Sequence, residues 1–374
     1  MRRRPLLAVL PLAPAVIARS VRAEDGGLDK VQRKVMTVKS FHLESGQVMP
    51  EIVVAYETYG TLAPDGRNGV LLAHGYTSSQ HMAGRYADGS GAEGSWSGLV
   101  GPGKAIDTDR LFVVSSNMLG SSYGSTGPAF LNPDIRLPYG PTFPDITLLD
   151  IVNVEKALLD GLGVKHLVAV AGPSFGGYQT FQWGVSHPGF MDGLVPVVSA
   201  PKGMGGEAAV QALVDRLAKD PHWNGGWFYE TGGITGVLTE LRIATLKRYG
   251  IDEQLAQQFP DKSQRDAEIA RRALAWAKVF DGNSLVVLRK AAVRFDAEKD
   301  FDKIKARLLY VLSRTDRVFP PSIAPGVMAK LKAAGVDADY FEIDSEFGHS
   351  ASGLDAAKWA PRLRAFMASL EKRS

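Results

Sequence analysis

A serine between two glycines, Ser174, is the first candidate for chemistry in this sequence. It lies in the Gly-Pro-Ser-Phe-Gly sequence at 172–176, after the apolar run 166–172 and before a segment typical of a helix. A strand, a sharp turn and a helix in this order form a nucleophile elbow, which exposes the serine hydroxyl. A second Gly-x-Ser-x-Gly sequence, at 120–124, leads into a loop instead. The context therefore predicts Ser174 as the nucleophile.

A serine hydroxyl needs a base to take its proton, and that base needs a carboxylate to orient it. Three histidines follow Ser174. His187 lies at the end of a predicted helix and His222 in a helix-rich segment, whereas His349 lies in a loop after a strand-like run. Asp316 begins the loop after another strand-like run. The chain order Ser, Asp, His is one that hydrolases with this elbow use, so we predict Ser174, Asp316 and His349 as a catalytic triad.

Two backbone N–H groups are expected to bind the oxyanion that forms when a serine attacks a carbonyl. One belongs to the residue after the nucleophile, Phe175, and the other to a loop after an earlier strand. The apolar run 69–73 is followed by His-Gly-Tyr-Thr-Ser, which predicts Tyr76 as the second donor and leaves His74 to hold the loop. No His/Asp/Glu cluster has metal spacing and no dinucleotide-binding fingerprint is present, so we expect neither a metal nor a cofactor.

Buried strands and helices alternate along most of the chain, which predicts an α/β fold with a doubly wound, mostly parallel sheet. From 201 to 300 the sequence is rich in helical patterns only, and the strand pattern resumes directly afterwards. We therefore expect a core formed by 36–200 and 301–374, with a helical lid inserted at 201–300.

The composition excludes several classes of function. The formal net charge is only +3, from 43 basic and 40 acidic residues, so no basic surface for nucleic acid is expected. The chain has no cysteine, which excludes disulfides and a cysteine nucleophile. We expect a small-molecule ester or acyl substrate as the partner.

The first residues have a basic start, an apolar stretch and small residues before Ala23, which is the pattern of a signal peptide at 1–23. Cleavage after Ala23 would give a periplasmic or secreted protein, and the arginine pair near the start also permits twin-arginine export. The apolar stretch is too short to span a bilayer, so no stable membrane anchor is expected.

Several long motifs resemble the homoserine O-acetyltransferase branch of the α/β-hydrolase fold. They lie at 101–133, 143–177, 280–284, 316–321 and 331–349. The resemblance implies an α/β-hydrolase fold with an inserted helical lid, the same triad and the same oxyanion donors. It also implies a homodimer formed through the helical insertion. Arg242 and Tyr249 have a spacing similar to that of the family's contacts with the substrate carboxylate.

The chain departs from that family at positions that concern the substrate. His349 is followed by Ser350, where the acetyltransferases have an aspartate that receives the substrate amine. Gly250 follows Tyr249, where an arginine is usual, and the loop at Tyr76 is closer to that of ordinary esterases. An exported enzyme would also lack acetyl-CoA, so water becomes the expected acceptor.

These observations predict an exported serine hydrolase that cleaves an ester or amide through an acyl-serine intermediate. The first alternative is homoserine O-acetyltransferase-type transfer from acetyl-CoA, in which a second alcohol takes the acyl group. The second alternative is a non-catalytic binding protein on a hydrolase scaffold, since a fold alone does not establish an activity.

Overall fold

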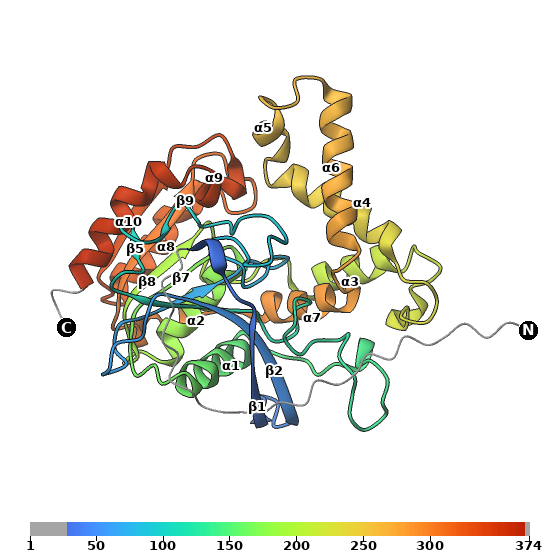
Figure 1. Ribbon diagram of the computed structural model, residues 1–374, viewed down its shortest axis with the longest axis horizontal. Coiled ribbons are helices and arrows are strands. Elements are labelled where there is room, and N and C mark those ends of the chain that lie inside the picture. Colours follow the sequence, from blue (N-terminus) through green and yellow to red (C-terminus); the bar gives the residue numbers. More distant parts are fainter. Residues whose placement is uncertain (1–27, 371–374) are drawn as a thin grey trace, which may run out of the picture.

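The computed structural model describes residues 28–370 and shows an eight-stranded sheet with helices on both sides (Figure 1). The strand order is β1-β2-β6-β3-β7-β8-β9-β10. β1 and β2 pair antiparallel, as do β2 and β6, and the other pairs are parallel. The predicted doubly wound, mostly parallel sheet is confirmed. The strands are β1 Lys34–His42, β2 Val48–Tyr59, β3 Gly69–Ala73, β6 Phe112–Ser116, β7 Leu167–Pro173, β8 Met191–Val197, β9 Arg307–Ser313 and β10 Ala338–Ile343, with a separate pair β4 Val100–Gly101 and β5 Ile106–Asp107.

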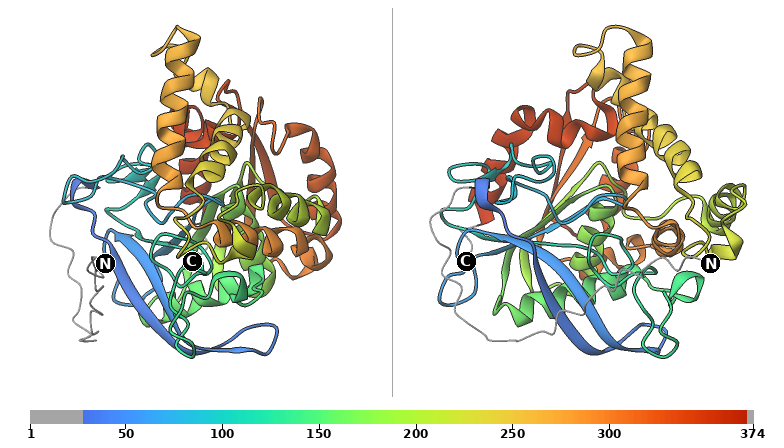
Figure 2. Two further views of the ribbon diagram at one scale, coloured as in Figure 1. Left: turned by 90° about the vertical axis from the view of Figure 1, so that its right-hand side faces the viewer. Right: turned by 45° about the vertical axis from the view of Figure 1, so that its right-hand side comes forward.

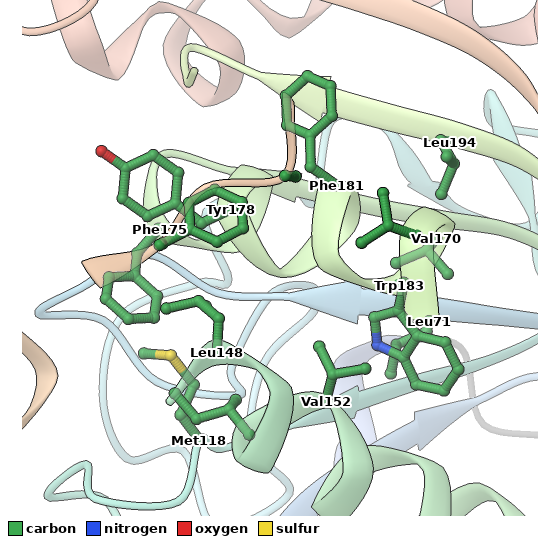
Figure 3. Packing of buried hydrophobic residues seen from close by; sticks show 14 of the residues in the cluster. Leu71, Met118, Leu148, Val152, Val170, Phe175, Tyr178, Phe181, Trp183 and Leu194 are labelled. Carbon is green, nitrogen blue, oxygen red and sulfur yellow. The ribbon is translucent and has the colours of Figure 1, made fainter. Parts of the chain in front are cut away.

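The central strands are apolar on both faces because helices cover both faces. In β7, Val170 belongs to the cluster that contains α1 and α2, while Ala169 and Ala171 belong to the cluster that contains α10. Figure 3 shows Val152 of α1 and Trp183 of α2 packed near Leu71 of β3. The helices around the sheet are α1 Leu148–Gly161, α2 Phe175–Ser186, α8 Ala324–Ala333, α9 Ala351–Leu354 and α10 Ala356–Leu370, with short 3-10 turns η1 Leu28–Lys30, η2 Gly140–Thr142, η4 Glu298–Lys303, η5 Pro321–Ile323 and η6 Gly348–Ser350.

Between β8 and β9 the chain forms helices only, and α4, α5 and α6 stand away from the sheet (Figures 1 and 2). The segment leaves and rejoins the core through a narrow stem, where Lys202 forms an isolated antiparallel bridge and an ion pair of 2.6 Å with Asp296. That this segment acts as a lid stays a prediction. Its elements are α3 Gly206–Leu217, η3 Asn224–Gly226, α4 Thr235–Arg248, α5 Ile251–Leu255, α6 Lys262–Ala277 and α7 Gly282–Arg294.

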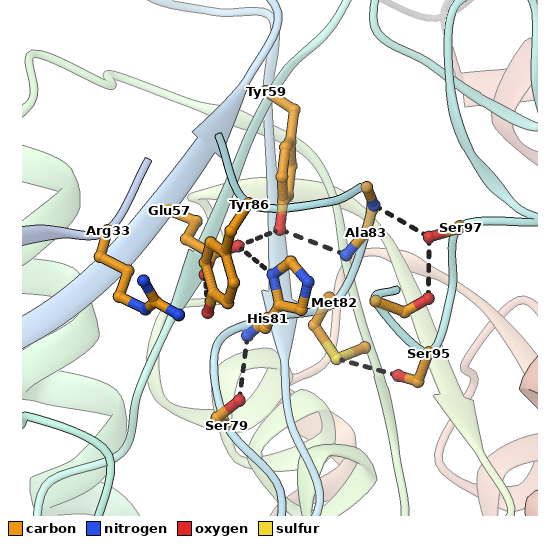
Figure 4. A network of polar contacts seen from close by, with 12 residues as sticks. Arg33, Glu57, Tyr59, Ser79, His81, Met82, Ala83, Tyr86, Ser95 and Ser97 are labelled. Atoms are coloured by element: carbon orange, nitrogen blue, oxygen red, sulfur yellow. Dashed lines mark hydrogen bonds and ion pairs between the residues drawn. The ribbon is translucent and has the colours of Figure 1, made fainter. Parts of the chain in front are cut away.

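A buried carboxylate fastens the segment after the Tyr76 loop to β2. Glu57 accepts hydrogen bonds from the hydroxyls of Tyr59 and Tyr86, both at 2.7 Å, and from Nδ1 of His81 at 3.0 Å (Figure 4). Nε2 of His81 lies 3.1 Å from the carbonyl oxygen of Ala92. Both ring nitrogens of His81 therefore face an oxygen acceptor, which fixes the orientation of the ring.

Within residues 28–370, no helix is long and apolar enough to cross a bilayer. The same residues contain no group of three or more His, Cys, Asp or Glu side chains placed to hold a metal ion.

A second buried carboxylate, Glu155 of α1, lies on the face of the sheet that α1 and α2 cover. It accepts hydrogen bonds from Nε1 of Trp183 at 2.7 Å and from the hydroxyl of Ser116 at 3.1 Å. Burial disfavours the charged form and raises the pKa of Glu155 to about 7, from its ordinary value of 4.5. Between pH 4.5 and about pH 7, Glu155 is protonated in the folded protein and ionised in the unfolded chain. The free energy of unfolding therefore falls as the pH rises through this range.

We expect Glu155→Gln to remove this pH dependence. The neutral amide has no charge to desolvate, so the variant loses less stability than the wild type between pH 5 and pH 8, by up to about 3 kcal/mol. Urea unfolding at both pH values measures the difference. Glu51→Gln, at an exposed position on β2, is the matched control. Equal pH dependence in Glu155→Gln and wild type would contradict the expectation.

Candidate active site

Ser174 lies at the sharp turn between β7 and α2. Its backbone has φ 57° and ψ −118°, a conformation that a residue with a side chain adopts only when its surroundings enforce it. The N–H of Ser174 donates to the carbonyl of Val197 at 2.8 Å, and its own carbonyl accepts from the hydroxyl of Ser199 at 2.7 Å. These bonds hold the turn in its strained form, which is the backbone geometry that a nucleophile elbow requires.

The glycines that flank Ser174 allow the elbow to pack against the end of β3. A Cβ added at Gly172 would lie 2.5 Å from the carbonyl oxygen of Ala73, and one added at Gly176 would lie 2.1 Å from the same atom. At Gly177 an added Cβ would lie 2.3 Å from Cβ of Ser199. These approaches are too close for any side chain, which explains why glycines occupy positions 172, 176 and 177.

The structure brings His349 and Asp316 together. Asp316 follows β9 and His349 lies in η6 after β10, so both are at the carboxyl ends of parallel strands. Nδ1 of His349 donates to Oδ2 of Asp316 at 2.8 Å, and both side chains are buried. The other carboxylate oxygen accepts from the N–H groups of Val318 and Phe319 at 2.7 and 3.2 Å. The proton therefore lies on Nδ1, and Nε2 is free to accept one.

Nε2 of His349 is buried and has no hydrogen-bond partner in the described part of the chain. The structure therefore shows no hydrogen bond between this nitrogen and the hydroxyl of Ser174. Aromatic rings link the two neighbourhoods: Phe175 lies 5.7 Å from Tyr178, Tyr178 lies 5.9 Å from Phe319, and Phe319 lies 5.8 Å from His349, between ring centroids. Catalytic hydrogen bonds are often long without substrate and tighten when it binds. The roles of Ser174, Asp316 and His349 stay predictions.

The loop after β3 lies against the elbow. A Cβ added at Gly75 would lie 3.7 Å from Cβ of Ser174, and the Tyr76 ring stacks on Phe175 at 6.0 Å. Neither the N–H of Tyr76 nor that of Phe175 donates to an acceptor among residues 28–370. Both predicted oxyanion donors are thus next to Ser174 and unused in this structure.

His74 holds that loop from within. Its Nδ1 lies 2.9 Å from the carbonyl oxygen of Gly75, and its Nε2 lies 3.1 Å from the N–H of Met118. Nδ1 therefore donates and Nε2 accepts, which is the pattern of a neutral ring. Burial lowers the pKa of His74 to about 4 and keeps the ring neutral near pH 7.

Arg242 lies on α4 and Tyr249 directly follows this helix, and both side chains reach the site. Nη1 of Arg242 donates to the hydroxyl of Thr77 at 2.7 Å, and its guanidinium lies 5.1 Å from the centre of the Trp276 ring. Burial lowers the pKa of Arg242, and no carboxylate pairs with it among the described residues. The ring of Tyr249 lies 4.5 Å from that of His349. Both predicted substrate contacts therefore border the proposed catalytic groups, and their binding role stays a prediction.

Two glycines allow Tyr249 to approach His349, a contact that the sequence analysis missed. A Cβ added at Gly250 would lie 3.1 Å from the carbonyl oxygen of Phe347, and one at Gly348 would lie 3.2 Å from that of Tyr249. Both glycines also have positive φ, 92° and 52°. Gly250 was the feature of the sequence that could have indicated this contact, because a glycine in place of a large side chain indicates that two backbones approach closely.

The rejected candidates have other partners. The hydroxyl of Ser122 accepts from the N–H of Asp281 at 3.0 Å. Nε2 of His187 lies 3.1 Å from Oδ1 of Asn153, and the exposed His222 pairs with Asp220. No hydrogen bond or ion pair joins any of these side chains to Ser174 or His349 within residues 28–370.

Comparison with known proteins shows the family to which this chain belongs. The sequence model of the alpha/beta hydrolase fold matches residues 69–355. A homoserine O-acetyltransferase of Symbiobacterium thermophilum is 36% identical over 356 residues, covering 88% of this chain and 92% of that protein. The homoserine O-acetyltransferase of Haemophilus influenzae strain KW20 is 37% identical over 339 residues, covering 85% and 93%.

Solved structures agree with this placement. Esterase E22 is 28% identical with a TM-score of 0.83, covering 90% of this chain and 100% of its own. A homoserine O-acetyltransferase from Bacillus anthracis is 26% identical with a TM-score of 0.82, covering 90% and 98%.

The expected periplasmic or secreted location is wrong, because the matching relatives are homoserine O-acetyltransferases, which are cytosolic biosynthetic enzymes. The signal peptide expected at 1–23 lies outside the described residues. Because that location is wrong, a lack of acetyl-CoA no longer speaks against acyl transfer by this protein.

The relatives that match over most of the chain are enzymes, which also overturns the alternative of a non-catalytic binding protein. The fold, the elbow and the relatives agree. The chain therefore belongs to the α/β-hydrolase fold family, in its homoserine O-acetyltransferase-like branch, and is an esterase-like hydrolase or O-acetyltransferase.

Proposed function

We propose that the protein transfers an acetyl group from acetyl-CoA to the hydroxyl of homoserine or of a related hydroxy acid. The observation that carries this proposal is the match to homoserine O-acetyltransferases at 36–37% identity across 85–88% of the chain. The position of Arg242 supports it, since a guanidinium without an acidic partner suits the carboxylate of an amino or hydroxy acid.

In the first half-reaction Ser174 attacks the thioester carbonyl while His349 takes the hydroxyl proton on Nε2. The N–H groups of Tyr76 and Phe175 bind the oxyanion. The C–S bond then breaks, the thiol leaves with the proton from His349, and the acetyl group remains on Ser174. Asp316 keeps the imidazole in the required tautomer throughout.

In the second half-reaction the acceptor hydroxyl gives its proton to His349 and attacks the acetyl-serine. The bond between the serine oxygen and the acetyl carbon breaks, and His349 returns the proton to Ser174. One acetyl group has moved, and the products are the free thiol and the O-acetyl ester.

Hydrolysis is the second candidate, and the similarity to esterase E22 favours it. Ser350 also follows His349, where the acetyltransferases have an aspartate for the substrate amine. In this case water replaces the acceptor alcohol and the products are a carboxylic acid and an alcohol.

We expect thiol release from acetyl-CoA to increase when homoserine is added, with O-acetylhomoserine as the product by mass spectrometry. The full chain is the enzyme and Ser174→Ala is the control for uncatalysed release. The same rate with and without homoserine, together with rapid cleavage of simple esters, would contradict transfer and support hydrolysis.

A further inference from the structure

Arg289, on α7, is a basic residue with no acidic partner among residues 28–370. The neighbouring basic residues of this helix, Lys290 and Arg294, both pair with Asp145, at 2.8 and 2.9 Å. Arg289 is half-buried and forms no hydrogen bond or ion pair with the part of the chain that the structure describes. A partly desolvated guanidinium is unfavourable unless an anion compensates it. The missing partner is therefore expected to be a ligand.

The packing of α7 places the backbone of this residue beside the oxyanion loop. The hydroxyl of Tyr76, in the oxyanion loop, donates to the carbonyl of Leu285. A helix carbonyl points toward the residue four positions later, which here is Arg289. The end of the Tyr76 side chain and the backbone of Arg289 thus meet at the same turn of α7.

The charge of Arg289 acts on three tyrosines that surround the proposed catalytic groups. Burial raises the pKa of Tyr76, Tyr178 and Tyr249, and in each case the Arg289 guanidinium opposes the rise. Tyr76 belongs to the oxyanion loop, Tyr178 to the elbow helix, and the Tyr249 ring lies on His349. The guanidinium of Arg289 is thus close enough to all three tyrosines for its charge to act on them.

The acidic side chains of this region already accept hydrogen bonds from other groups. Asp316 binds His349 and two backbone N–H groups. Asp281 caps α7 by accepting from the N–H of Ser284 at 2.9 Å. The site therefore presents two guanidinium groups, those of Arg242 and Arg289, and no acid that pairs with either among residues 28–370.

We propose that Arg289 binds a second substrate carboxylate, in addition to the one expected at Arg242, so that the preferred substrates carry a negative charge for each guanidinium. The proposal rests on the acyl-serine chemistry proposed above. The carboxylate can belong to the acyl chain, as in a dicarboxylic half-ester, or to the alcohol that accepts the acyl group.

The acyl chain is tested with 4-nitrophenyl acetate and the mono-4-nitrophenyl ester of succinate. We expect Arg289→Met to lower the ratio of kcat/KM for the succinate ester to that for the acetate ester by about 10- to 100-fold, the effect of losing a hydrogen bond to a charged group. Methionine keeps the apolar stem, and Arg289→Lys should restore part of the ratio because it restores the charge. Lys290→Met is the control and should leave the ratio unchanged, because Lys290 already pairs with Asp145.

The acceptor is tested with 4-nitrophenyl acetate as donor and either 4-hydroxybutanoate or 1-butanol as acceptor. A loss in Arg289→Met confined to 4-hydroxybutanoate would assign the carboxylate to the alcohol. An Arg289→Met variant with unchanged selectivity in both series, or with equal losses for charged and neutral substrates, would overturn the proposal.

A binding measurement separates this proposal from the proposed chemistry. Succinate should raise the melting temperature of the wild type more than that of Arg289→Met, whether or not the enzyme turns over. If the wild type is no more active than Ser174→Ala, the acyl-serine chemistry fails. If the wild type is active and Arg289→Met binds succinate equally well, only the role of Arg289 fails.

Discussion

Ser174→Ala is expected to abolish turnover of acetyl-CoA and of 4-nitrophenyl esters, with kcat lower by about 10⁶-fold, as when other triad enzymes lose their serine. The elbow holds this hydroxyl in a strained backbone conformation next to two unused N–H groups. Alanine keeps the backbone and removes the attacking atom. Covalent labelling by a fluorophosphonate, followed by mass spectrometry of the intact protein, measures the loss without any knowledge of the substrate.

The matched control is Ser122→Ala, in the second Gly-x-Ser-x-Gly sequence. The hydroxyl of Ser122 accepts from the N–H of Asp281, and Ser122 lies in a loop instead of at a strand-to-helix turn, so labelling should remain. Labelling of Ser174→Ala at the wild-type rate would show that another residue is the nucleophile.

Asp316→Asn is expected to lower kcat by about 10⁴-fold, with a smaller effect on stability. Oδ1 of Asp316 accepts two backbone N–H groups, and the amide oxygen of asparagine keeps those bonds. The amide NH₂ then faces Nδ1 of His349, which must accept instead of donating. The ring proton moves to Nε2, where it prevents the ring from taking the proton of Ser174.

Steady-state kinetics and urea unfolding of the same Asp316→Asn preparation separate these effects. Asp344→Asn is the control, since this exposed carboxylate pairs with Arg314 outside the site. A kcat near that of the wild type in Asp316→Asn, with normal folding, would contradict the assigned orientation of the imidazole.

The sequence predicted the sheet and the arrangement around the elbow because both depend on local patterns. Apolar runs of strand length indicated the parallel strands, and parallel strands place their carboxyl ends at one edge. Asp316 and His349 each follow such a strand, so their contact at 2.8 Å could be expected from strand order alone. The need for glycine at 172 and 176 comes from a tertiary contact with the carbonyl oxygen of Ala73, but the strand, Gly-x-Ser-x-Gly and helix pattern that indicates it is local.

Contacts made by the inserted helices could not be predicted in the same way. The approach of Tyr249 to His349, and of α7 to Tyr76, depends on how helices far apart in sequence pack together. Helical periodicity shows that a helix forms but does not say which loop it will meet. The wrong prediction of a periplasmic or secreted location has a different cause, because it depended only on the composition of residues 1–23 and on no tertiary contact.

The narrow stem at Lys202 and Asp296 has a consequence for the evolution of this enzyme. Since the chain departs and returns through adjacent residues, changes in the length or sequence of the intervening part leave the strand order intact. Arg242 and Tyr249, which we expect to select the substrate, both come from that exchangeable part, whereas the reacting groups come from the sheet. Descendants of one ancestor can therefore acquire new substrates without rebuilding the machinery that breaks and forms the acyl bond.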